Sequence, residues 1–212
     1  MPFRIRFLFV TPIVALMLLS ACRPSFEPPA AVVGGVRITQ AELRDQLALV
    51  LTNPQLAAQL KGPGGAELRR SITRRLLAAL VRRDIIDAFA RAQHVVVSPG
   101  DVARALGGIV RQTGGLAQFR RILRQRGLTE EEVRENIYES LIEQKVHDAV
   151  AFIRLGGKGT AQQADQAFSR WLSEQLQKAD VQVNPRFGRF DPKTGAVCPL
   201  DTTADTVSCP AA

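Results

Sequence analysis

Residues 119–134 read FRRILRQRGLTEEEVR. Phe119 and Leu123 lie one helical turn apart, which predicts a helix with both side chains facing inward. Gly127 follows, and glycine is the residue that most readily adopts the left-handed conformation at a helix end. Thr129 and Glu132 then have the spacing of a capping box, which starts another helix. This stretch therefore predicts two helices joined by a short turn.

The same signals predict further helices on both sides of this pair. Thr39 with Glu42 forms another capping box, and Ser98 followed by Pro99 places an N-cap before a proline at the first helical position. Stretches rich in Gly and Pro, including residues 61–65, separate the helices as loops. The predicted helices cover residues 40–51, 66–93, 99–113, 116–126, 130–153 and 161–178.

Short β segments flank these helices. Residues 31–38 read AVVGGVRI, which indicates two strands around a Gly-Gly turn. Residues 180–184 alternate as a strand does, but they have no hairpin partner nearby. Their simplest partner is the N-terminal segment. We therefore predict a mostly α fold, a bundle of about six helices with a small β element that pairs the N-terminal and C-terminal segments of the domain.

The first residues resemble an export signal. Arg4 and Arg6 precede an apolar run over residues 7–19, and Cys22 follows Leu-Ser-Ala as in the lipobox of bacterial lipoproteins. We expect a signal peptide over 1–21, a lipid on Cys22 and a flexible tether over 22–30, with the mature chain extracytoplasmic and held on the cell membrane. The apolar run is shorter than the roughly 20 residues of a spanning helix. An uncleaved anchor and cleavage without lipidation are the alternatives.

The C-terminal region contains two further cysteines. Residues 184–190 read NPRFGRF, and we expect them to pack as a C-terminal lock rather than to bind a ligand. Cys198 and Cys209 lie in a polar, proline-containing tail over 191–212. An oxidising compartment favours a disulfide between them.

The chain is basic, with a net charge of +8 that falls to +6 when Arg4 and Arg6 leave with the signal. An exported chain rarely meets nucleic acid, so we exclude it as a partner and favour anionic headgroups, envelope polymers or acidic client segments. Solvated helix faces are the more common explanation of such arginines. They recur in two helices: Arg69, Arg70, Arg74, Arg75, Arg82 and Arg83, then Arg120, Arg121, Arg124 and Arg126.

No residue pattern indicates an active site. His94 and His147 have no carboxylate or cysteine at metal-ligand spacing in the sequence. The acidic run over 130–132 resembles a catalytic cluster, but the dipole of a helix start explains it. We therefore expect no catalytic residue, no cofactor and no metal, and a protein that is not an enzyme.

Three stretches together resemble the N-terminal domain of the SurA and PrsA family of extracytoplasmic chaperones and foldases. They are residues 33–39 (VGGVRIT), 97–102 (VSPGDV) and 119–134, within a resemblance that covers about 32–153. Gly34 stands where the family usually has Asn. The last stretch matches the family pattern Phe-x-x-x-Leu-x-x-x-Gly-Leu-Thr-x-x-x-Leu-Arg except that Val133 replaces Leu.

The resemblance implies a helical chaperone domain over 31–190, completed by a C-terminal helix and strand over 161–184 that return to the N-terminal segment. In the family a parvulin domain precedes that return. Here it would have to fit between residues 153 and 161, whereas a domain needs on the order of a hundred residues, so prolyl isomerase activity is not expected.

The resemblance implies an ATP-independent holdase that binds unfolded or newly exported polypeptides. An adaptor lipoprotein that binds one folded envelope partner is the alternative. The sequence assigns no client-contacting residues.

Overall fold

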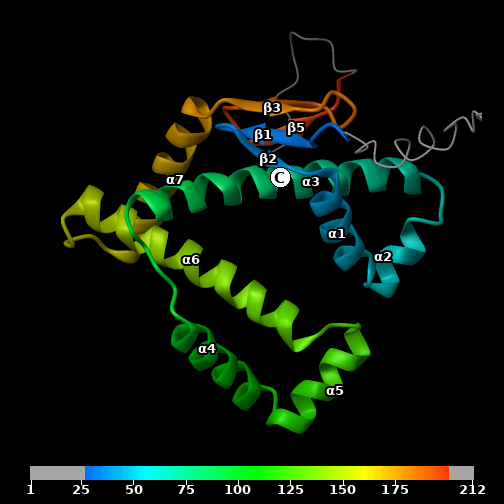
Figure 1. Cartoon of the computed structure of the whole chain (residues 1–212), viewed down its shortest axis with the longest axis horizontal. Coiled ribbons are helices and arrows are strands. Elements are labelled where there is room, and N and C mark those ends of the chain that lie inside the picture. Colours follow the sequence, from blue (N-terminus) through cyan, green and yellow to red (C-terminus); the bar gives the residue numbers. More distant parts are fainter. Residues whose placement is uncertain (1–26, 201–212) are drawn as a thin grey trace, which may run out of the picture.

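The computed structural model describes residues 27–200, and within them the chain folds into seven helices and five short strands (Figure 1). The mostly α fold predicted from the sequence is confirmed. The helices are α1 (Gln40–Leu51), α2 (Pro54–Gln59), α3 (Gly65–Ala92), α4 (Pro99–Gln112), α5 (Leu116–Arg126), α6 (Glu130–Leu155) and α7 (Ala161–Lys178). None of them combines the length and apolarity that crossing a membrane requires.

Local signals set the helix ends. Helices α4, α6 and α7 each begin with a complete capping box, and Gly127 ends α5 in the left-handed conformation at φ +66°. Helix α2 lies in a stretch that we expected to be a loop. The side chain of Asn53 caps it by accepting from the backbone N–H groups of Gln55 and Leu56, and Pro54 occupies its first turn.

A three-stranded sheet joins the two ends of the domain. Strands β1 (Ala31–Val33), β2 (Val36–Ile38) and β3 (Val181–Val183) lie in the order β2-β1-β3, with both pairs antiparallel. Ala31 lies opposite Val183, so the predicted return of residues 180–184 to the N-terminal segment is confirmed. Gly34 and Gly35, at φ +54° and +86°, make the turn between β1 and β2.

A second hairpin, β4 (Arg189–Asp191) and β5 (Ala196–Cys198), spans the end of the expected C-terminal lock over 184–190 and the start of the expected tail over 191–212. Val197 is 6% exposed and belongs to the main core, while Phe190 packs against that core. These strands have only three residues each, which is too short for alternation to reveal. The tail, expected from residue 191 onward, is therefore folded at least through β5.

The N-terminal segment before β1 is also fixed in place. Gln40 Nε2 donates to the carbonyl oxygen of Pro28 at 2.7 Å, and Asn184 Nδ2 donates to that of Pro29 at 3.2 Å. Glu27 forms an ion pair with Arg44 at 2.9 Å, and Ala30 is fully buried. The flexible tether expected over 22–30 therefore does not include residues 27–30.

Helix α3 runs through the main core, between the sheet on one side and α1 and α6 on the other (Figure 1). Leu77, Val81 and Val146 are completely buried there. A second apolar cluster joins α4 and α5 to the first half of α6, with Phe119 and Leu123 facing inward as predicted. Because α6 contributes to both clusters, it carries the α4–α5 arm on the body of the domain.

Acidification should loosen the attachment of α4 to α6. Lys145 Nζ on α6 donates to Asp101 Oδ2 at 2.8 Å, and the backbone N–H of Ser98 donates to the same carboxylate at 3.0 Å. The bond from Lys145 and then those at Ser98 lower the pKa of Asp101 from 3.8 to about 2. Since the folded pKa lies below the unfolded one, this stabilisation is present above about pH 4 and is lost as the pH falls toward 2.

Thermal melts of the wild type and of Asp101→Asn test this expectation. The variant should melt lower than the wild type near neutral pH, and the difference should shrink once the pH falls below about 3, where Asp101 itself becomes protonated. A difference that stays constant across this range would contradict the assigned role of Asp101.

Candidate binding cleft

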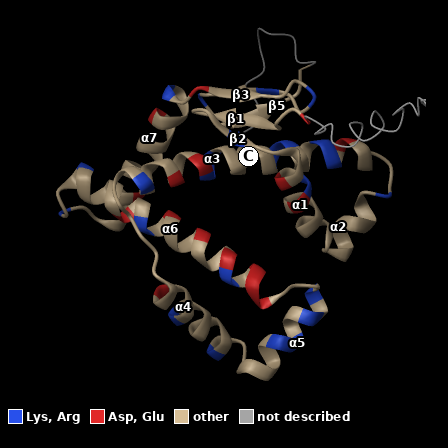
Figure 2. Ribbon diagram, viewed as in Figure 1, with Lys and Arg blue, Asp and Glu red and all other residues tan. Residues whose placement is uncertain are grey.

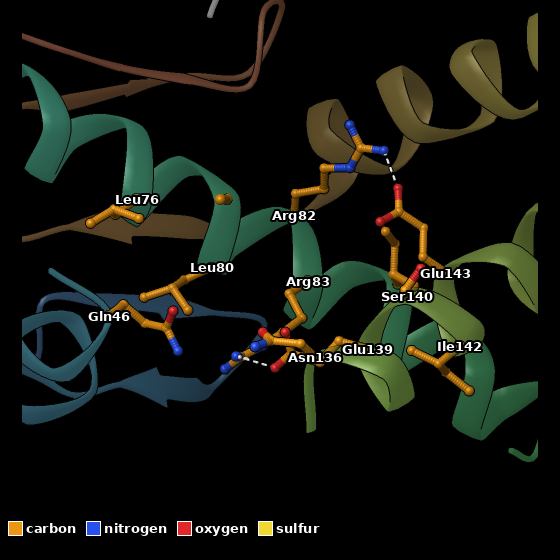
Figure 3. A pocket seen from close by; sticks show the side chains of 12 residues that line it. Gln46, Leu76, Leu80, Arg82, Arg83, Asn136, Glu139, Ser140, Ile142 and Glu143 are labelled. Atoms are coloured by element: carbon orange, nitrogen blue, oxygen red, sulfur yellow. Dashed lines mark hydrogen bonds and ion pairs between the residues drawn. The ribbon is translucent and has the colours of Figure 1, made fainter. Parts of the chain in front are cut away.

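A cleft of about 390 Å³ opens between α1, α3 and α6 (Figure 3). Its lining residues are Gln46 from α1, then Leu76, Ala79, Leu80, Arg82, Arg83 and Ile86 from α3, and Asn136, Glu139, Ser140, Ile142 and Glu143 from α6. We call this feature the α3 cleft. Its volume lies within the range of about 300–1,000 Å³ that small-ligand pockets occupy.

The cleft lies on the face of α3 that points away from the sheet. Ala79 lines the cleft, whereas Ala88 lines a separate hollow together with Val33 and Val36 of the sheet. Nine residues correspond to two and a half helical turns, so Ala79 and Ala88 lie on opposite faces of α3. One face of the helix thus supports the sheet and the other faces the cleft.

The floor of the cleft is apolar. Leu80, Ile86 and Ile142 belong to the main core and are at most 5% exposed, so the floor is rigid and continuous with the core. Leu76 is partly buried beside them, and Ala79 is exposed to solvent. A ligand in the cleft would gain apolar contacts chiefly with Leu76 and Ala79, which remain accessible.

Ion pairs between helices surround this floor. Arg83 of α3 pairs with Glu139 of α6 at 3.0 Å, and Arg82 pairs with Glu143 of α6 (Figure 3). Arg83 also pairs with Glu42 of α1. Although partial burial opposes it, the charges of Glu139 and Glu42 raise the pKa of the Arg83 guanidinium above its ordinary value. These pairs hold the three helices at a fixed separation. The arginine pair that the sequence suggested was simply solvated is therefore engaged with other helices.

The lining of the α3 cleft is suited to binding. Each charged group among the lining residues has an opposite charge as its partner. An apolar floor with a charged rim suits an extended peptide, because apolar side chains can enter while the polar backbone remains at the rim.

Of the three cysteines with a predicted role, the structure describes one, Cys198. Cys22 and Cys209 lie outside the described residues, so lipid attachment and the pairing of Cys198 with Cys209 stay predictions. Cys198 itself lies in β5 and is 4% exposed.

The two histidines lie in different segments of the fold. His94 follows the end of α3 at φ +53°. His147 Nε2 on α6 lies 3.0 Å from Asp165 Oδ1 on α7, a carboxylate neighbour that its spacing of 18 residues concealed. Within residues 27–200, no group of three or more His, Cys, Asp or Glu side chains is placed to hold a metal ion.

The acidic run at the start of α6 has local partners. Glu132 accepts from the backbone N–H of Thr129 at 2.6 Å, and Glu130 accepts from Arg134 Nη2 at 2.8 Å. Both contacts lie within the first two turns of α6. They agree with the interpretation that these acidic residues stabilise the start of a helix.

Helices α6 and α7 pack against one another. Only residues 156–160 connect them. Gly156 ends α6 in the left-handed conformation at φ +59°, and Thr160 caps α7 through Gln163. A compact domain therefore has no place between these two helices.

The fold and cleft define a helical domain closed by its own two ends. The chain matches the SurA-like N-terminal domain family over residues 4–147, and it belongs to this family. The family predicted from the three sequence stretches is thus confirmed, and it is a chaperone-type family. No curated protein matches the chain. The family match ends within α6 and so does not cover α7 and β3, whose return to the N-terminal strand the structure shows.

Proposed function

We propose that this protein is a membrane-anchored, extracytoplasmic, ATP-independent holdase for unfolded or newly exported polypeptides, and that it has no prolyl isomerase or other catalytic activity. The observation that carries the proposal is the α3 cleft, which is open, apolar at its floor and charged at its rim. Membership of a chaperone-type family agrees with it.

The cleft has the properties that holding an unfolded chain requires. Such a chain exposes apolar side chains next to an unsatisfied backbone, and the floor around Leu80 and Ile142 can bury the former while the rim leaves the latter hydrated. We expect such an open site to bind weakly and to tolerate many sequences. Release then needs no nucleotide, because weak complexes dissociate on their own.

Two sequence features support the rest of the proposal. The lipobox-like residues before Cys22 support export and anchoring. The link over 156–160 between α6 and α7 supports the absence of an isomerase domain at the position where the resemblance places one.

Ala79→Arg should impair the holdase. The exchange puts a long cationic side chain across the apolar floor, at a position that is exposed and therefore not needed for the core. The assay is light scattering by an aggregating exported protein, in the presence of the mature chain with Cys22→Ser. We expect about fivefold more of the variant to be needed for half-maximal suppression, equivalent to the loss of about 1 kcal/mol of binding.

Ala103→Arg provides the matched control, since Ala103 is an exposed alanine of α4 and does not line the α3 cleft. It should suppress aggregation as well as the wild type does. Absence of suppression by the wild type at several-fold molar excess would refute the holdase proposal. Capture of a single folded envelope protein, with no preference for unfolded chains, would support the adaptor alternative.

A further inference from the structure

We propose that the arginine face of α5 is a docking site for acidic segments of unfolded polypeptides. This inference rests on the proposed holdase function and names a class of client for it. The face consists of Arg120, Arg121 and Arg124, all exposed, in a helix that contains no acidic residue. We call it the α5 arginine face (Figure 2 shows the basic residues along α5).

The three arginines share one side of the helix. Arg124 lies one turn from Arg120 and, around the helix axis, between Arg120 and Arg121, so the three occupy one sector of about 100°. Phe119 and Leu123 point inward and are 3% and 7% exposed. The packing of α5 thus depends on the apolar side, and the arginine face is not required for it.

These arginines have no partners among the described residues, unlike most of the arginines of α3. None of the three forms an ion pair or a side-chain hydrogen bond within residues 27–200, whereas Arg70, Arg74, Arg82 and Arg83 all do. The acidic start of α6 follows α5 directly, but Glu130 binds Arg134 and Glu132 binds Thr129 instead. The guanidinium donors on α5 are therefore available to carboxylates, whose geometry they match.

The position of α5 favours a polypeptide over a bilayer. In Figure 1 α5 lies at the end of the molecule opposite the sheet, and the described chain begins beside that sheet at Glu27. A membrane approached through the N-terminal tether would then face the sheet side and not α5.

The test uses two labelled, unstructured peptides of equal length and equal apolar content. One is rich in Asp and Glu, and the other has Asn and Gln at the same places. Their affinities for the mature Cys22→Ser chain are measured by fluorescence anisotropy at low salt. The variant Arg120→Gln/Arg121→Gln/Arg124→Gln should bind the acidic peptide about tenfold more weakly, as expected for three exposed charge contacts, and the neutral peptide almost unchanged.

A control variant, Arg69→Gln/Arg75→Gln/Arg170→Gln, removes the same charge from exposed sites on α3 and α7 and should leave both affinities unchanged. If the two triple variants lose affinity for the acidic peptide equally, or if the α5 variant loses none, the docking proposal is overturned. Binding of the neutral peptide would in that case still support the holdase proposal. Binding of neither peptide by the wild type would refute both. If only binding to phosphatidylglycerol vesicles depends on the α5 arginine face, its partner is a membrane and the proposal fails.

Discussion

Trp171→Ala should destabilise the whole domain by about 3–5 kcal/mol. Trp171 lies in α7, is 5% exposed, and contacts Phe89 of α3 edge-on with the ring centres 4.8 Å apart. It also stacks on Phe168, 5.4 Å away. Truncation removes these contacts and leaves a cavity between α7 and α3. The expected loss is comparable to the total stability of many domains, so urea unfolding followed by circular dichroism should show a far lower midpoint.

Trp171→Phe is the matched control. It keeps an aromatic ring against Phe89 and should cost only about 1–2 kcal/mol, because less volume is removed. An alanine variant with an unchanged midpoint would show that α7 does not contribute to the core. That result would also mean that α7 does not fold as one unit with residues 4–147, which the family match covers.

Gly188→Ala should disrupt the β4–β5 hairpin. Gly188 is at φ +131°, and a Cβ there would lie 2.0 Å from the carbonyl oxygen of Cys198. The obstacle is backbone, which has no rotamer to move away. Together with the strain of the positive φ, the exchange should cost at least about 2–3 kcal/mol. Hydrogen exchange should show loss of protection at Phe190 and Val197, with a lower melting temperature for the domain.

Gly100→Ala is the corresponding control. Gly100 lies in the first turn of α4 at an ordinary φ, and a Cβ there would meet only Ser98 Oγ at 3.6 Å. This exchange should be neutral or stabilise the domain by about 0.5 kcal/mol, because it reduces the freedom of the unfolded chain. Unchanged protection of the hairpin in Gly188→Ala would show that β4 and β5 do not pack as the structure has them.

Much of the fold was predictable because its signals are local. Thr129 with Glu132 and Gly127 mark helix ends within a few residues, and the helix bounds agree with the structure at these points. The pairing of β3 with β1 was predictable for another reason: a strand with no local partner must pair with a distant one. Asn53 and Pro54 carried a start signal for α2 as well, but they were interpreted only as a loop.

The remainder depends on contacts between distant residues. The β4–β5 hairpin is stabilised by burial of Val197 on a core that other segments build. The α3 cleft combines faces of α1, α3 and α6, and no single helix reveals it. Arg83 illustrates the difference: its spacing in α3 suggested a solvated face, whereas its partners Glu42 and Glu139 lie 41 and 56 residues away.

The fixed N-terminal segment would limit how far the domain can move from the proposed anchor at Cys22. Because Glu27 is held by Arg44 and Pro28 by Gln40, only residues 23–26 remain between Cys22 and the folded body. A chain of this length spans at most about 18 Å. With the proposed lipid on Cys22, the N-terminal end of the folded domain would stay within this distance of the membrane surface. That distance is shorter than helix α3. Clients would then be bound close to the bilayer surface. A longer linker inserted before Glu27 would let the domain move farther from that surface.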